Sequence, residues 1–229
     1  MHSIYVRGSV ARNLAVPGVS DIDSFAVLVP ESAEPDRGRL AGWSAEVDRE
    51  VRQSFPFVAG VEVDLVPVGA VFDRRNFYAF VMKTAAVCLH GESLANRLRP
   101  FRLSEVDFQT RYFREHLEVF ITEFPEEAVT ERPAFVGWIA KRFLRLGMEL
   151  VMEREKRYSP DLYLCYESFA KHYPQHAKSM YRALELAVHP VADEGAEQFL
   201  HGFGSWLALE ADRRLAASVQ GCGHWTINS

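Results

Sequence analysis

The sequence lacks the features that mark membrane, secreted and disulfide-stabilised proteins. No hydrophobic run approaches the length of a membrane span, and Arg7 and Arg12 interrupt any apolar core of a signal peptide. The three cysteines, Cys88, Cys165 and Cys222, are scattered and odd in number, so no disulfide framework is expected. No internal repeat or low-complexity segment is present. We therefore expect a cytoplasmic globular protein with no membrane partner.

Concentrated positive charge is also missing. The chain has 31 acidic and 26 basic residues, a formal net charge of −5, and only short Lys/Arg clusters. Proteins that bind polynucleotides usually carry a basic stripe, so DNA and RNA are disfavoured as partners. A mildly acidic surface is compatible with a cationic small molecule. With 229 residues, 48% of them hydrophobic, the chain can form one large domain or two small ones.

What is present is an acidic pair at the start of an apolar run. Asp21 and Asp23 precede the run Phe25 to Val29. Side chains alternate along a strand, so the two carboxylates are expected on one face, with Ile22 on the other. Two carboxylates on one face repel each other unless a cation lies between them. Mg²⁺ is the cation that suits an all-oxygen site facing phosphate.

A second feature ends at Ser9, and eleven residues separate Ser9 from Asp21. The apolar run Ile4 to Val6 leads through Arg7 to Gly8 and Ser9. A Gly-Ser turn that leads into a helix offers backbone N–H groups and a hydroxyl to an anion. Together the two features predict a site for a metal–nucleotide complex.

This arrangement resembles the DNA polymerase β-like nucleotidyltransferase superfamily. Its signature is an apolar residue, Gly-Ser, a spacer and then Asp-x-Asp, with a third carboxylate on a later strand. The third carboxylate is expected in residues 60–67, where Asp64 lies between Val63 and Leu65. Glu62 fits formally and shares a face with Asp64. Asp64 is preferred because its strand continues as Leu-Val-Pro, as is common in relatives.

The resemblance implies transfer of a nucleoside monophosphate, AMP in the first instance, from ATP or another NTP to an acceptor hydroxyl. Asp21 and Asp23 would hold two Mg²⁺ ions. Asp64 would complete the second metal site or accept the hydroxyl proton. Gly8 and Ser9 would bind the terminal phosphates.

Two further residues are candidates for this site. Arg12, one helical turn after Ser9, is placed to reach a phosphate, and a solvated surface arginine is the equally open alternative. Glu92 follows the short strand at residues 87–89. In the aminoglycoside adenylyltransferases, which the chain resembles in its layout, a glutamate after the core strands serves as the base, so Glu92 is a candidate base.

The pattern of elements predicts an α+β fold: a small mixed sheet forming a nucleotidyltransferase domain over residues 1–95, then an α-helical bundle over 104–229. The two parts resemble the antibiotic nucleotidyltransferases, in which a small-molecule acceptor lies between them. Strands are expected over 4–6, 21–29, 58–68 and 87–89. Helices are expected over 9–15, 36–54, 76–86, 104–124, 131–158, 160–171, 175–187 and 192–217, with Ser104 as a helix cap.

Three alternatives stay open. One is a regulatory nucleotidyltransferase with a toxin-like helical domain, because Arg111 and His116 match the Arg-x4-His spacing of helical ribonuclease toxins. A salt-bridged surface helix is the simpler interpretation of that spacing. The others are a protein-modifying enzyme and a nucleotide-binding module without catalysis.

Overall fold

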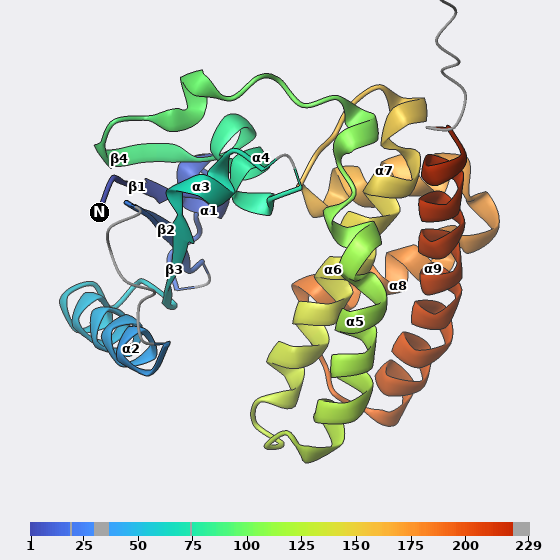
Figure 1. The fold of residues 1–229 in the computed structure, drawn as a ribbon. Helices are drawn as coiled ribbons and strands as arrows, with labels where there is room; N and C mark the ends of the chain where they lie inside the picture. Colours follow the sequence, from blue (N-terminus) through green and yellow to red (C-terminus); the bar gives the residue numbers. More distant parts are fainter. Residues whose placement is uncertain (19, 30–36, 74, 222–229) are drawn as a thin grey trace, which may run out of the picture. The chain divides into compact units, whose positions relative to one another are not determined.

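The computed structural model describes residues 1–18, 20–29, 37–73 and 75–221. It divides the chain into two compact units, Met1–Phe101 and a second unit that begins at Arg102 (Figure 1). This division falls in the segment left between the two predicted domains. A four-stranded sheet lies in the first unit and a set of long helices in the second, which confirms the α+β class. Across the described ranges, no helix combines the length and the apolar character needed to span a membrane.

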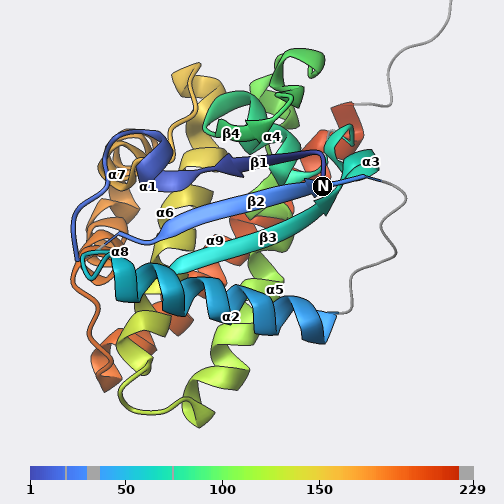
Figure 2. The same cartoon turned by 90° about the vertical axis from the view of Figure 1, so that its left-hand side faces the viewer.

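The sheet is mixed and has the strand order β3-β2-β1-β4 (Figure 2). β1 pairs antiparallel with both β2 and β4, and β2 pairs parallel with β3. The strands are β1 (Ser3–Val6), β2 (Ile22–Leu28), β3 (Val61–Pro67) and β4 (Val87–Gly91). β3 begins three residues later than predicted because Val58 N donates to Phe55 O in a turn and Ala59 N donates to Ser20 O.

The helices of the first unit are α1 (Gly8–Ala11), α2 (Arg37–Ser54), α3 (Val68–Val71) and α4 (Phe77–Thr84). α1 is shorter than the predicted helix over 9–15. The chain turns at Asn13, which adopts the left-handed conformation with φ 56°, and Leu14 N donates back to Ser9 O. α3 follows β3 directly and was not predicted.

An aromatic core packs on the face of the sheet that carries Tyr5 and Phe25. Tyr5 stacks on Phe25 with ring centroids 4.9 Å apart, and Phe25 contacts Tyr78 at 5.1 Å. The Tyr5 hydroxyl accepts a hydrogen bond of 2.7 Å from Leu94 N. Asn76 caps α4 by accepting from Tyr78 N, which fixes the start of the helix that carries Tyr78. These contacts make the sheet and α4 one packed body.

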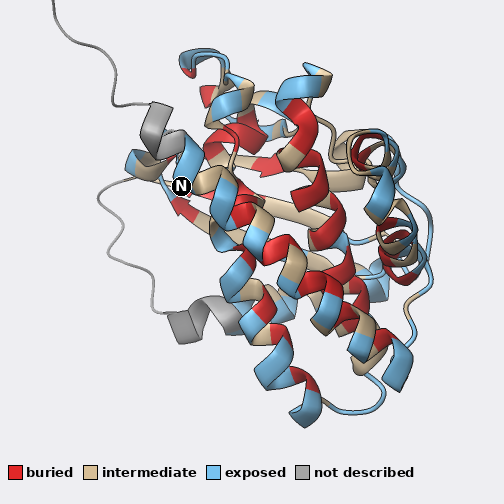
Figure 3. Ribbon diagram, turned by 90° about the vertical axis from the view of Figure 1, so that its right-hand side faces the viewer, coloured by how far each residue is buried: buried red, intermediate tan, exposed pale blue. Residues whose placement is uncertain are grey.

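The second unit is an α-helical bundle built around α6, which packs against the other four long helices. Buried positions follow the sides on which these helices contact one another (Figure 3). The helices are α5 (Phe108–Glu123), α6 (Arg132–Glu155), α7 (Leu162–His172), α8 (Ala177–Val188) and α9 (Glu194–Gly221).

The start of α5 corrects one prediction. Ser104 does not cap this helix: it lies in a separate 3-10 turn, Leu103–Glu105, and α5 begins only at Phe108. The N-cap residue of α5, Asp107, makes no capping hydrogen bond with its side chain and instead forms an ion pair with Arg111. The predicted cap was therefore three residues too early.

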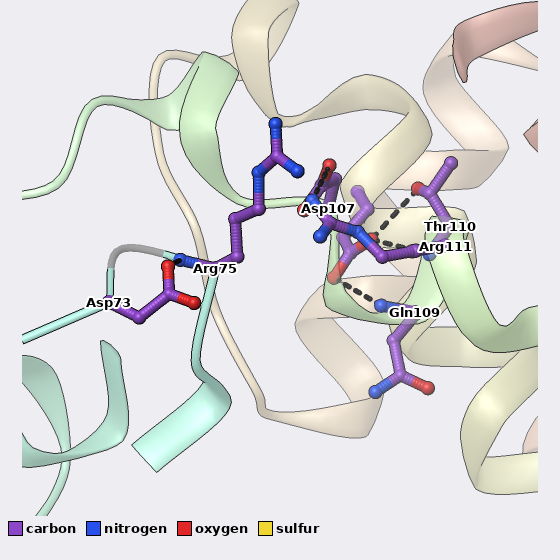
Figure 4. A network of polar contacts seen from close by, with 7 residues as sticks. Asp73, Arg75, Asp107, Gln109, Thr110 and Arg111 are labelled. Atoms are coloured by element: carbon purple, nitrogen blue, oxygen red, sulfur yellow. Dashed lines mark hydrogen bonds and ion pairs between the residues drawn. The ribbon is translucent and has the colours of Figure 1, made fainter. Parts of the chain in front are cut away.

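A carboxylate from α6 performs the capping. Glu149, almost fully buried, accepts hydrogen bonds from Gln109 N at 2.9 Å, from Thr110 N at 2.8 Å and from Thr110 Oγ1 at 2.8 Å (Figure 4). Burial raises the pKa of Glu149, and the three hydrogen bonds oppose that rise. Two of the free N–H groups at the beginning of α5 are thus satisfied by a residue about forty positions away.

Candidate functional site

The pairing of β1 with β2 brings the two parts of the N-terminal motif together. Arg7 N donates to Asp23 O at 2.8 Å and so extends the ladder past Val6. Gly8 has φ +73°, and a Cβ at this position would collide with the Asp23 carboxylate. Glycine is required at residue 8 for both reasons, the left-handed backbone and the close approach.

The parallel register of β2 and β3 adds two more carboxylates. Asp23 lies opposite Glu62, and Phe25 lies opposite Asp64. Because strand side chains alternate, Asp23, Glu62 and Asp64 all lie on one face of the sheet. Glu62 and Asp64 are therefore not exclusive alternatives, since both join Asp23. We call these three side chains the carboxylate cluster.

The guanidinium of Arg7 lies among the three carboxylates. Its Nη2 is 3.3 Å from Asp23 Oδ1, 3.2 Å from Glu62 Oε2 and 3.4 Å from Asp64 Oδ2. The Arg7 side chain is only 17% exposed, and its buried Nε has no hydrogen-bond partner. Its Cζ lies 6.0 Å from the ring centroid of Phe77. One positive charge is thus surrounded by three negative groups.

Burial and the neighbouring charges of the cluster together shift the pKa of Glu62. Burial raises this pKa, and a hydrogen bond shared with Asp23 and the negative charge of Asp64 raise it further, while Arg7 lowers it. Burial is the largest cause of the raised pKa, and the two neighbouring carboxylates add to it in the presence of Arg7. The cluster retains the capacity to bind additional positive charge.

Tyr78 is a further member of this site. Burial raises its pKa, and so does its hydrogen bond to Asp64. The phenol therefore stays protonated and donates to that carboxylate. This contact links the cluster to α4.

The other predicted residues near the motif have different positions. Asp21 is exposed and lies just before the first residue of β2. Ser9 O accepts from Arg12 N and Leu14 N within the turn, and Arg12 Nε donates to Gly8 O at 3.2 Å. Arg12 is thereby held beside the Gly-Ser turn.

Glu92 does not join the cluster. Gly91 pairs with Ser3, at the beginning of β1, whereas the carboxylates lie beyond Val6 at the other end of that strand. Four strand residues correspond to about 13 Å. The prediction that Glu92 borders the same cleft failed because β4 runs antiparallel to β1, and the strand direction was not evident from the sequence.

The Arg-x4-His pair of α5 is engaged in contacts within the second unit. Arg111 Nη2 binds Asp107, with the closer oxygen at 2.6 Å. His116 packs edge-on against Trp138, and its buried Nδ1 has no hydrogen-bond partner. Burial lowers the pKa of His116 to about 4, and the charge of Arg142 adds to the effect, so the imidazole is neutral at pH 7.

Arg7 and Tyr78 were not predicted as site residues. Strand alternation places Arg7 on the same face as Tyr5, but its position beside Asp23 follows only from the antiparallel pairing of β1 with β2. The position of Tyr78 likewise depends on how α4 packs against the sheet.

The donor set of the cluster fits a hard cation. Carboxylate oxygens are ligands that Mg²⁺ prefers, and substrate phosphates commonly complete such sites. Within the described ranges no three His, Cys, Asp or Glu side chains form a ready-made ligand group. The three carboxylates are instead spaced around a guanidinium. Comparison with protein-family models and with curated proteins finds no match for this chain.

Proposed function

We propose that the chain is a Mg²⁺-dependent nucleotidyltransferase that moves a nucleoside monophosphate, AMP from ATP in the first instance, to a hydroxyl of a small-molecule acceptor. The observation that carries the proposal is the meeting of the Gly8-Ser9 turn with Asp23, Glu62 and Asp64 on one face of the sheet. This is the arrangement implied by the resemblance to the DNA polymerase β-like nucleotidyltransferases, whose core we infer for residues 1–95.

In this proposal, one group of residues would bind the metal and another would bind the phosphates. Asp23, the exposed Asp21 and a carboxylate of β3 would hold Mg²⁺, which when bound neutralises charge on the entering and leaving oxygens. Ser9 would donate its hydroxyl to the terminal phosphates, and Gly8 would allow the backbone to approach them. Arg12, held by Gly8 O, would add positive charge beside the same phosphates.

The proton of the attacking hydroxyl needs an acceptor. The acceptor oxygen forms a bond to the α-phosphorus, the bond to the pyrophosphate oxygen breaks, and pyrophosphate leaves. A raised pKa makes a carboxylate a stronger base, which favours Glu62 for this role. Asp64, which accepts from Tyr78, would serve mainly as a metal ligand. Glu92 has no part in this mechanism because it lies at the other end of β1.

A second candidate, a nucleotide-binding module without catalysis, is favoured by one observation. Arg7 already supplies a positive charge to all three carboxylates. A module of this kind would bind NTP through the Gly-Ser turn and would not release pyrophosphate.

Calorimetric titration with Mg·ATP and the other Mg·NTPs tests the proposal. The wild type is expected to bind at least one of them, and Asp23→Asn is expected to weaken binding by tenfold or more, because it removes a proposed metal ligand. Glu46→Gln is the control, since Glu46 is an exposed carboxylate of α2 that pairs only with Arg49 in the described contacts. It should bind as the wild type does.

A pyrophosphate-release assay with a panel of hydroxyl-rich acceptors then separates the two candidates. Release with at least one acceptor supports the transferase. Binding without release across the panel supports the binding module, and a wild type that binds no Mg·NTP contradicts both.

A further inference from the structure

The arginine inside the carboxylate cluster has a role that the motif does not imply. We propose that Arg7 is a built-in competitor of the divalent metal: it neutralises the cluster in the resting protein and must leave the carboxylates when the metal binds. The inference rests on the proposed function, because it takes a divalent cation as the ligand of these carboxylates.

The first argument is geometric. A single nitrogen, Nη2, contacts Asp23, Glu62 and Asp64 at 3.2 to 3.4 Å. A Mg²⁺ ion binds carboxylate oxygens at about 2.0–2.1 Å, and therefore requires the oxygens to approach the same centre more closely. The nitrogen and a metal ion shared by these carboxylates cannot occupy that centre together.

The second argument is electrostatic. A divalent cation next to a guanidinium would face a like charge at a few ångströms in a partly buried site, where screening by water is reduced. The carboxylates attract the metal and Arg7 opposes it. Removal of the Arg7 charge should therefore strengthen metal binding rather than weaken it.

The third argument concerns what the displaced side chain would bind. Arg7 immediately precedes Gly8 and Ser9, the proposed phosphate-binding turn, and its buried Nε lacks a hydrogen-bond partner. A triphosphate at the turn would offer oxygens to this nitrogen and to the guanidinium released from the cluster. Metal and triphosphate should then bind cooperatively, because the triphosphate removes the competitor from the carboxylates.

Mn²⁺ binding, followed by the electron paramagnetic resonance signal of the free ion, tests the inference without any turnover. Arg7→Gln is expected to bind Mn²⁺ about tenfold more tightly than the wild type. Arg7→Lys, which keeps the charge, should stay close to the wild type. Arg49→Gln removes an exposed arginine of α2 and is the control, with unchanged affinity. Inorganic tripolyphosphate should tighten Mn²⁺ binding in the wild type and have a smaller effect in Arg7→Gln.

Equal or weaker Mn²⁺ binding by folded Arg7→Gln overturns the inference, as does the absence of Mn²⁺ binding in both proteins. If Arg7→Gln does not fold, a chemical-modification experiment on the wild type tests the same displacement of Arg7. Phenylglyoxal modification of Arg7, read by mass spectrometry, should increase severalfold when Mn²⁺ alone is added, because no triphosphate is then present to hold the displaced guanidinium. No increase contradicts displacement.

The two proposals fail separately. If Arg7→Gln tightens Mn²⁺ binding while no acceptor supports pyrophosphate release, the competition by Arg7 holds and the transferase activity does not. If pyrophosphate is released and the Mn²⁺ affinities are equal, the transferase holds and the competition does not.

Discussion

The two units each withdraw carboxylates from water, but they treat these groups in opposite ways. In the bundle, Glu149 is buried and its oxygens are satisfied by three hydrogen bonds from the beginning of α5. In the sheet unit, Asp23, Glu62 and Asp64 share one guanidinium and keep part of their surface exposed. The first arrangement is complete without a ligand. The second retains excess negative charge, which is the property expected of a binding site.

The largest effect on stability is expected when the buried carboxylate of Glu149 is removed. Glu149→Ala leaves the N–H groups of Gln109 and Thr110 buried without acceptors and creates a cavity, so we expect a loss of about 2–4 kcal/mol in the free energy of unfolding. Denaturant unfolding measures it. Glu153→Gln, an exposed change on the same helix, should alter stability by less than about 0.5 kcal/mol. A loss for Glu149→Ala as small as that of the control would show that water replaces the cap.

A smaller effect on stability is expected at Gly8, which lies against the carboxylate cluster of the sheet unit. Gly8→Ala places a methyl group against the Asp23 carboxylate and requires φ +73° from a residue with a Cβ. We expect a loss of about 1–2 kcal/mol in stability and a clear loss of Mg·NTP binding. Gly42→Ala is the matched control, because it lies in α2 with open space around it. If both variants keep stability and binding, the close approach of Gly8 to Asp23 is not needed.

His116 in the bundle differs from Glu149, because its buried ring nitrogen Nδ1 has no hydrogen-bond partner. Its pKa of about 4 in the folded state lies below its usual value of 6.5. The unfolded chain therefore binds more protons between these values, and stability should fall as the pH decreases from 6.5 to 4.

His116 is only half-buried, so solvent screening reduces the effect well below that of a fully buried group. We expect His116→Phe to remove about 1 kcal/mol of that pH dependence, measured by urea unfolding at several pH values. His189→Gln, an exposed change at the end of α8, should leave the pH dependence as it is in the wild type. Identical pH profiles for His116→Phe and the wild type would contradict the assigned burial.

The smallest effect is expected at Glu62. Its folded-state pKa is raised, so ionised Glu62 costs stability, and this cost is absent below the unfolded pKa and develops as the pH rises through the folded pKa. Glu62→Gln should therefore stabilise the protein at pH 7 by up to about 0.5 kcal/mol and have no such effect near pH 4. Thermal unfolding at both pH values checks it, with Glu46→Gln as the exposed control. Destabilisation at pH 7 would mean that the ion pair with Arg7 outweighs the repulsion.

The sequence predicted well wherever the signal is local. The alternation of apolar residues located the four strands, and apolar periodicity located the long helices, with errors at their ends. The prediction that Glu62 and Asp64 share a face needs only strand alternation. That Asp23 lies on the same face depends on the register of β2 against β3, which the sequence does not give.

The failures depend on contacts between distant segments. The position of Glu92 required the direction of β4 relative to β1, and the position of Tyr78 required the packing of α4. Ser104 has the composition of a cap, but the residue that caps α5 is Glu149, on another helix. No pattern within α5 records that partner.

The cap supplied by Glu149 has a consequence for how the bundle forms. The first turn of α5 lacks a side-chain cap of its own at Asp107, so it is completed only when α6 is in place. The amides of Gln109 and Thr110 should then exchange with solvent hydrogen at the rate at which the α5–α6 pair opens, and not at the faster rate of a fraying helix end. The first turn of α5 thereby becomes a reporter of helix docking.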